Sequence, residues 1–98
     1  MSGVNSAETD RLFQAILSLR TVKECYDFFG DACTIQEIQE IARRFDVACR
    51  LEKGGNYQEI YRETGVSTAT ICRVSRCLNY GSNGYRTAIA RLKDGQGE

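Results

Sequence analysis

The chain has 98 residues with thirteen basic and thirteen acidic side chains, so its formal net charge is zero. A chain of this length forms one domain at most, here residues 1–98, and it buries only about 60% of its unfolded surface, which favours an oligomer. Histidine and CxxC pairs are absent, and no apolar run approaches the ~20 residues of a membrane span. We therefore expect a cytoplasmic protein with no signal peptide, no metal site and no membrane partner, whose five cysteines are free thiols.

The charges are distributed unevenly along the chain. Residues 1–42 carry three basic and seven acidic side chains, whereas residues 43–93 carry ten basic and four acidic ones. Positive charge collected in one part of a neutral protein is typical of a surface that contacts phosphate groups. A solvated surface of mixed charge is the alternative interpretation of this pattern.

Apolar residues recur at helical spacing in the first part of the chain. A first helix is expected over residues 7–20, after a disordered segment at 1–6. A second helix starts at Thr21, which opens a T-x-x-E capping box, and is expected to break at Gly30–Asp31. These helices and the next carry more apolar surface than a short monomer can bury, so we expect a homodimer.

The longest expected helix covers about residues 34–53. A second capping box opens it, and Gly54–Gly55 stops it. The last helix is expected over about 84–93, and residues 94–98 are expected to be disordered. With the two helices described next, the sequence predicts an all-α fold of six short helices.

Residues 57–76 read YQEIYRETGVSTATICRVSR, which is the pattern of a helix-turn-helix. A helix at 57–63 runs into Gly65, where the backbone must turn with positive φ, and a second helix starts at Ser67. Two short helices packed at a steep angle need apolar side chains at the positions of Ile60, Val66, Ile71 and Val74. A helix-turn-helix at about 57–80 would place its second helix in the DNA major groove, and a plain helical hairpin is the alternative.

The second helix begins with small side chains that allow close approach to base edges and thymine methyl groups. Ser67 can cap this helix, and the helix N-terminus can meet a phosphate. Polar side chains at the start of the preceding helix suit phosphate contacts. The candidate DNA-binding residues are Asn56, Gln58, Ser67, Thr68, Ala69, Thr70, Cys72, Arg73 and Arg76.

The segment from Cys33 to Gly81 resembles the Trp repressor superfamily, and most closely its short Trp-repressor-like subgroup of the YerC/YecD type. The matching features are the capped helix from Thr34, Arg44 within that helix, and the ETGVSTATICR block. The resemblance extends over about residues 10–92. It implies an interwound homodimer in which most helices interlock between subunits and the helix-turn-helix reads DNA as a transcriptional repressor.

The resemblance also implies an effector site between the long helix and the recognition helix. In tryptophan-sensing members, two arginines sandwich the indole ring and one of them holds the carboxylate, chemistry that suits guanidinium groups. The matching candidates here are Thr34, Arg44, Thr70, Arg73 and Cys77. Val74 replaces the glycine that leaves room for the indole, and Cys77 replaces a serine that helps to hold the amino group. We therefore expect no tryptophan cofactor, and Arg44 and Arg73 bind another anion or serve structure and DNA binding only.

The sequence thus predicts a sequence-specific transcriptional regulator that binds double-stranded DNA as a homodimer and represses transcription. The alternative is a protein-interaction module that keeps the helix-turn-helix shape without binding DNA. Enzyme activity is not expected, because the chain has no histidine, no phosphate-binding glycine-rich loop and no metal-ligand cluster.

Overall fold

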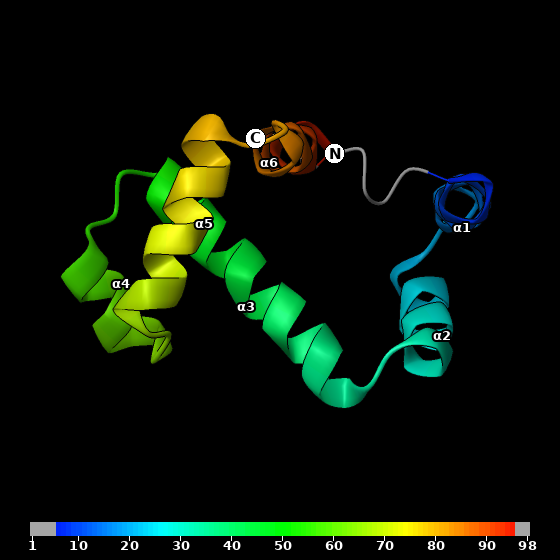
Figure 1. The fold of residues 1–98 in the computed structure, drawn as a ribbon, viewed down its shortest axis with the longest axis horizontal. Coiled ribbons are helices and arrows are strands. Elements are labelled where there is room, and N and C mark those ends of the chain that lie inside the picture. Colours follow the sequence, from blue (N-terminus) through cyan, green and yellow to red (C-terminus); the bar gives the residue numbers. More distant parts are fainter. Residues whose placement is uncertain (1–5, 96–98) are drawn as a thin grey trace. The chain divides into compact units, whose positions relative to one another are not determined.

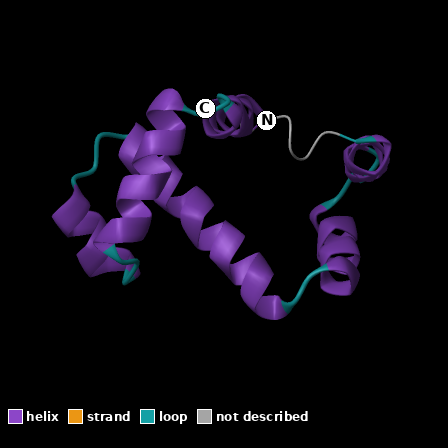
Figure 2. Ribbon diagram, viewed as in Figure 1, coloured by secondary structure: helices purple, strands orange, loops and turns teal. Residues whose placement is uncertain are grey.

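The computed structural model describes residues 6–95, and within this range it contains six helices and no strand (Figures 1 and 2). The chain divides into two compact units, Met1–Ile38 and Gln39–Glu98. The all-α prediction is confirmed, and the expectation of a single domain stays a prediction. The helices are α1 (Ala7–Leu17), α2 (Val22–Ala32), α3 (Ile35–Glu52), α4 (Tyr57–Thr64), α5 (Thr68–Tyr80) and α6 (Gly84–Gly95).

The expected end segments need a correction at three residues. Ser6 is the N-cap of α1, where its Oγ accepts a hydrogen bond from the backbone N–H of Thr9 at 3.1 Å. At the other end, α6 continues through Asp94 to Gly95. The remaining residues of the segments expected to be disordered, 1–5 and 96–98, lie outside the described part of the chain.

In the first unit, α1 ends at Leu17, three residues earlier than expected. The next helix uses the residues that follow. Thr21 caps α2 by accepting the N–H of Glu24 at 3.0 Å, and the Glu24 carboxylate accepts the N–H of Arg20 at 2.7 Å. These two bonds hold residues 20–24 in the geometry of a helix start, so α1 cannot extend into them.

The expected break of α2 at Gly30–Asp31 is wrong, because the helix runs through both residues to Ala32. A single glycine costs a helix only about 1 kcal/mol relative to alanine, too little to end it alone. The helix ends at Cys33, whose N–H donates to the carbonyl of Phe29 at 2.9 Å.

The bounds expected for the long helix α3 are confirmed to within a residue at each end. At its start, the Thr34 N–H donates to Glu37 Oε1 at 2.8 Å, and the Glu37 N–H donates to Thr34 Oγ1 at 3.1 Å. Both hydrogen bonds of a capping box are therefore present. At its end, Gly54 adopts φ +90° and Gly55 donates its N–H to the carbonyl of Arg50 at 2.9 Å.

The second unit packs the last part of α3 with α4, α5 and α6 around one apolar core. Each fully buried aliphatic side chain stabilises the fold by about 1.5–3 kcal/mol relative to an exposed one. All four apolar positions predicted for the helix-turn-helix are buried in this core. The core residues are Val47, Ala48, Ile60, Val66, Ile71, Val74, Leu78 and Ile89.

Two arginines connect the helices of this unit at its edge. Arg86 of α6 donates to Glu52 Oε1 at 2.6 Å, to the Leu78 carbonyl at 3.0 Å and to Asn79 Oδ1 at 3.0 Å. One side chain therefore joins α6 to the end of α3 and the end of α5. The second arginine, Arg50, similarly joins α3 to α4.

Arg50 donates from Nε to Asp46 Oδ2 at 3.0 Å and from Nη1 to Glu63 Oε1 at 2.5 Å. The hydrogen bond to Asp46 raises the pKa of Arg50 above its ordinary value. Exposed pairs of this kind contribute little stability each, so their main effect is to orient α4 against α3.

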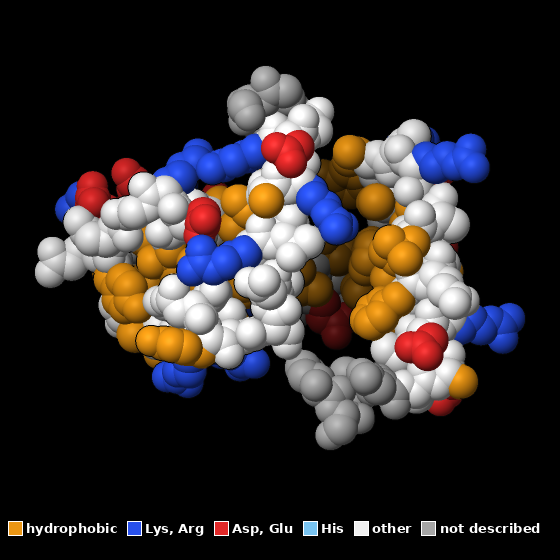
Figure 3. Space-filling view, turned by 90° about the horizontal axis from the view of Figure 1, so that it is seen from above, with side chains coloured by type: hydrophobic (Ala, Val, Ile, Leu, Met, Phe, Trp, Pro, Cys, Tyr) orange, Lys and Arg blue, Asp and Glu red, His pale blue; other side chains and the backbone are white. Residues whose placement is uncertain are grey.

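Large apolar side chains of α1, α2 and the first part of α3 are exposed in the single chain. The most exposed are Leu17 at 83%, Ile35 at 74%, and Val22 and Tyr26 at 73% each. Apolar side chains are visible at the surface in Figure 3. A monomer rarely exposes this many, so the observation agrees with the apolar excess expected from the sequence. Among the described residues, no helix combines the length and the apolar character that crossing a membrane requires.

Candidate nucleic-acid interface

The turn between α4 and α5 is fixed by hydrogen bonds within the chain. Gly65 has φ +74° and donates its N–H to the carbonyl of Tyr61 at 2.8 Å, which closes the end of α4. Thr64 Oγ1 donates to the carbonyl of Ile60 at 2.6 Å and accepts the N–H of Val66 at 3.1 Å. Val66 then enters the core. The predicted turn at Gly65 is confirmed, and the start of α5 has a defined direction relative to α4.

The first turn of α5 is capped as the sequence predicts. Ser67 Oγ accepts the N–H of Thr70 at 3.3 Å and lies 3.1 Å from Thr70 Oγ1. Because capping occupies the Ser67 hydroxyl, a phosphate at this end would be met first by the remaining backbone N–H groups of the first helical turn. Thr68 and Ala69 in that turn are exposed.

The exposed face of α5 carries two arginines. Ile71, Val74 and Leu78 are the buried side of the helix. At about 100° per residue, Arg73 and Arg76 fall on the opposite side, and both are exposed. Neither forms a salt bridge within residues 6–95. Their positive charges are therefore available to a negatively charged partner.

No acidic residue occurs anywhere in residues 64–93, a property of the sequence that its motifs alone do not reveal. This stretch includes the end of α4, the whole of α5 and most of α6. Its basic residues are Arg73, Arg76, Arg86, Arg91 and Lys93. Helix α5 therefore has no carboxylate of its own that would repel a phosphate group.

The two candidate DNA-binding residues at the start of α4 differ in whether their side chains are free to contact a phosphate. Asn56 caps α4: its Oδ1 accepts the N–H of Glu59 at 2.9 Å, and its Nδ2 donates to Glu59 Oε1 at 2.6 Å. Its side chain is therefore occupied in the helix cap. Gln58 is exposed and forms no side-chain hydrogen bond within the described residues. Of the two, Gln58 is the better placed to contact a phosphate.

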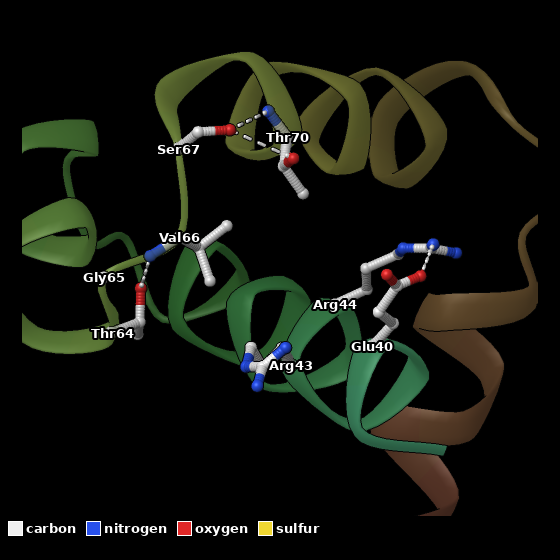
Figure 4. A pocket seen from close by; sticks show the side chains of 8 residues that line it. All are labelled: Glu40, Arg43, Arg44, Thr64, Gly65, Val66, Ser67 and Thr70. Carbon is white, nitrogen blue, oxygen red and sulfur yellow. Dashed lines mark hydrogen bonds and ion pairs between the residues drawn. The ribbon is translucent and has the colours of Figure 1, made fainter. Parts of the chain in front are cut away.

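A cleft of about 480 Å³ lies between α3 and the start of α5 (Figure 4). Arg43 and Arg44 line it on the side of α3, and Ser67 and Thr70 line it on the side of α5 (Figure 4). Arg44 Nη2 donates to Glu40 Oε2 at 3.2 Å. The cleft is lined by Glu40, Arg43, Arg44, Thr64, Gly65, Val66, Ser67 and Thr70.

The cleft brings together two of the candidate effector-binding residues, Arg44 and Thr70. Arg73 and Cys77 are exposed residues of α5 that do not line it. Thr34 belongs to the other compact unit. Arg43, which the sequence interpretation did not single out, lines the cleft beside Arg44; the signal was the adjacent Arg43–Arg44 pair on the long helix.

None of the five cysteines is paired with another within the described residues. Cys49 is the one that packs against the core, and burial raises the pKa of its thiol, with a smaller contribution from nearby Asp46. Cys72 and Cys77 are exposed on α5. Within residues 6–95 no group of histidine, cysteine or acidic side chains is arranged to hold a metal ion.

Comparison with known protein families identifies the family to which the chain belongs. The family of the Trp repressor protein matches residues 7–93, which is nearly the whole chain. The chain belongs to the Trp repressor family. Members of the Trp repressor family are regulators rather than enzymes.

Individual proteins support this assignment. The uncharacterized protein YerC of Bacillus subtilis strain 168 is 54% identical over 91 residues, which span 93% of this chain and 88% of YerC. The crystal structure of a TrpR-like protein from Eubacterium eligens has a TM-score of 0.89 at 48% identity, covering 94% of this chain and 95% of that one. The crystal structure of a candidate Trp repressor from Staphylococcus aureus also has a TM-score of 0.89, at 42% identity, and the match covers 94% of this chain and 92% of that one. The predicted Trp-repressor-like fold and subgroup are thus confirmed.

Proposed function

We propose that the protein is a sequence-specific DNA-binding transcriptional regulator, acting as a repressor through α4 and α5. Membership of the Trp repressor family supports this function. The observation that carries it is the exposed face of α5, where Arg73 and Arg76 stand without salt-bridge partners among the described residues. The small residues Thr68 and Ala69 in the first turn of α5 leave room for close approach to base edges.

The functional unit is proposed to be a homodimer. The support is the exposed apolar surface of α1, α2 and the start of α3, which a partner copy would cover. A two-fold symmetric pair would present two recognition helices, and an operator with two related half-sites would match them.

Tryptophan is not proposed as the effector. Val74 is only 2% exposed and its isopropyl group fills space in the core, where the tryptophan-binding pattern has glycine. Cys77, at the position of the serine in that pattern, does not line the cleft. We therefore expect DNA affinity to be the same with and without L-tryptophan.

The proposed function is tested by replacing the two exposed arginines of α5. Arg73→Ala and Arg76→Ala should each weaken binding to a fluorescently labelled DNA duplex about tenfold at low salt, measured by anisotropy, because each removes a charge-assisted hydrogen bond. Circular dichroism should show the helical content of the original protein, since both side chains are exposed. Arg91→Ala on α6 removes the same charge outside the proposed interface and should bind nearly normally.

Unchanged affinity in both α5 variants would contradict the proposal. A separate outcome is that the original protein binds no DNA at low salt. In that case the zero net charge favours the alternative of a protein-interaction module. That module would be recognised by a partner recovered in a pull-down with the folded protein.

A further inference from the structure

The cleft between α3 and α5 has one charge that no neighbour neutralises. Its charged lining residues all come from α3: Glu40, Arg43 and Arg44. Arg44 and Glu40 are bonded to each other at 3.2 Å. The Arg43 side chain is exposed and forms no hydrogen bond or salt bridge within the described part of the chain.

The acidic residues that could neutralise Arg43 along α3 are engaged elsewhere. Glu40 lies three residues before it and Asp46 three residues after, positions that share its side of the helix. Glu40 is bonded to Arg44, and Asp46 is bonded to Arg50 at 3.0 Å. The opposite wall of the cleft consists of uncharged residues, including Ser67 and Thr70. The site as a whole is therefore positive, and its free guanidinium belongs to Arg43.

The cleft lies next to the start of the proposed recognition helix. Figure 4 shows Arg43 on α3 across from Ser67 and Thr70 in the first turn of α5. A DNA strand that passes the first turn of α5 would bring its phosphates to the mouth of this cleft. Guanidinium groups bind phosphate oxygens in a bidentate fork, which gives both charge and orientation.

We propose that Arg43 binds a backbone phosphate of the DNA and thereby anchors the duplex from outside the helix-turn-helix. This inference rests on the proposed function, because it needs α5 to face DNA. The bound phosphate would fix the register of α5 in the groove without the reading of a base. The other ligand that would bind Arg43 by the same interaction is a phosphate-like anion free in solution.

The test compares the salt dependence of DNA binding between Arg43 variants of the full chain. The slope of log affinity against log salt falls by about 0.9 for each phosphate that the protein no longer neutralises. Arg43→Gln should reduce the slope by about this amount per phosphate and weaken binding about five- to twentyfold at low salt, equally for unrelated duplex sequences. Arg43→Lys, which keeps the charge but removes the fork, should keep most of the slope. Arg91→Gln, with the same charge change outside the cleft, should behave like the original protein.

The outcomes separate this inference from the function it rests on. If the original protein binds DNA and Arg43→Gln keeps its full salt slope, the anchor is wrong while the DNA-binding function stands. If Arg43→Lys reduces the slope as much as Arg43→Gln does, the charge of residue 43 is not what matters, and the anchor is again wrong. If the original protein binds no duplex at low salt, the proposed function itself fails.

A thermal denaturation series with inorganic phosphate distinguishes the source of the anion. Under the proposal, phosphate at millimolar concentration shifts the melting temperatures of the original protein and of Arg43→Gln equally. A stabilisation that disappears in Arg43→Gln, together with an unchanged DNA salt slope, would assign the cleft to a free anion and overturn the proposal.

Discussion

At the scale of single residues, Arg86 of α6 connects its helix with both α3 and α5. Its guanidinium donates hydrogen bonds to the Glu52 carboxylate at the end of α3, and to the Leu78 carbonyl and the Asn79 side chain at the end of α5. The position of α5 against the rest of the unit therefore depends on a side chain that lies outside the helix-turn-helix.

Arg86→Met keeps much of the length of the side chain and removes its three hydrogen bonds. We expect a decrease of about 1–2 kcal/mol in the free energy of unfolding, because the partners are partly solvated. For a chain of this size that corresponds to a fall in melting temperature of roughly 4–16 °C, measured by circular dichroism at fixed protein concentration. Arg91→Met, an exposed neighbour on α6 without such bonds in the described structure, is the control. Equal melting temperatures for the two variants would show that the connection contributes nothing.

Residue-level features were predictable where the cause is local. The caps at Thr21, Thr34 and Ser67 each bond a residue three positions later, so a short sequence pattern contains the whole interaction. The role of Arg86 was not predictable in this way. Its partner Glu52 is 34 residues distant in the chain, and only the folded structure brings the two together.

At the scale of elements, the turn at Gly65 decides how α5 leaves α4. Apart from Gly65 itself and its two chain neighbours, no atom lies within 4 Å of a Cβ added at Gly65, so tertiary packing does not require glycine there. The requirement is the backbone conformation, since φ +74° places a Cβ close to the following carbonyl oxygen. Replacing this residue therefore tests backbone strain alone.

Gly65→Ala should lower the free energy of unfolding by about 1–2 kcal/mol. Gly65→Asn should lower it by less, because asparagine tolerates the left-handed region better than alanine. Chemical denaturation followed by circular dichroism measures both. If Gly65→Asn lowers the free energy of unfolding as much as Gly65→Ala does, backbone strain is not the reason for glycine here, and the interpretation is contradicted.

Helix bounds were predicted well where a cap and a stop signal coincide, as at both ends of α3. They failed where one glycine was taken as a stop, since α2 continues through Gly30 to a cap at Cys33. They also failed at the end of α1. The apolar Leu19 extended the helical pattern. However, the Ser18 N–H and hydroxyl donate to the carbonyl of Ala15, which ends α1. The Arg20 N–H donates to the Glu24 carboxylate, which belongs to the cap of the next helix.

At the scale of the whole molecule, the division of apolar surface explains why the chain should pair with a copy of itself. The unit with α4, α5 and α6 has a buried core, whereas no residue of α1 or α2 is buried in the single chain. Composition could predict this excess because it depends only on how many apolar residues a short chain has to bury.

Leu17→Glu should convert the proposed homodimer to monomers. Leu17 is 83% exposed in the single chain, so the substitution does not disturb that chain's own packing. A two-fold interface would no longer bury two leucines, which contribute about 1.5–3 kcal/mol each, so the dissociation constant should rise at least a hundredfold. Sedimentation velocity measures the shift. The matched control is Ala15→Glu, which adds the same charge at an exposed position about 160° around the same helix from Leu17. A dimer of unchanged stability in Leu17→Glu would show that this face is not the interface.

The candidate site could be predicted only in part from the sequence. The helix-turn-helix residues follow from a contiguous pattern, and their exposure or burial agrees with it for Arg73, Arg76 and Val74. The effector residues came from a resemblance, and the cleft contains only Arg44 and Thr70 of that set. Arg43 was missed because its significance depends on which neighbouring carboxylates are already bonded, and this requires side-chain geometry.

The most direct test of DNA regulation through α5 is the binding of the unmodified protein to duplex DNA across a salt series, followed by fluorescence anisotropy. We expect binding at about 50 mM salt that weakens linearly in log affinity against log salt, with a slope of roughly 0.9 per neutralised phosphate. L-tryptophan should leave the curve unchanged. An absence of binding at low salt, with the protein folded and dimeric, would contradict the DNA-binding function.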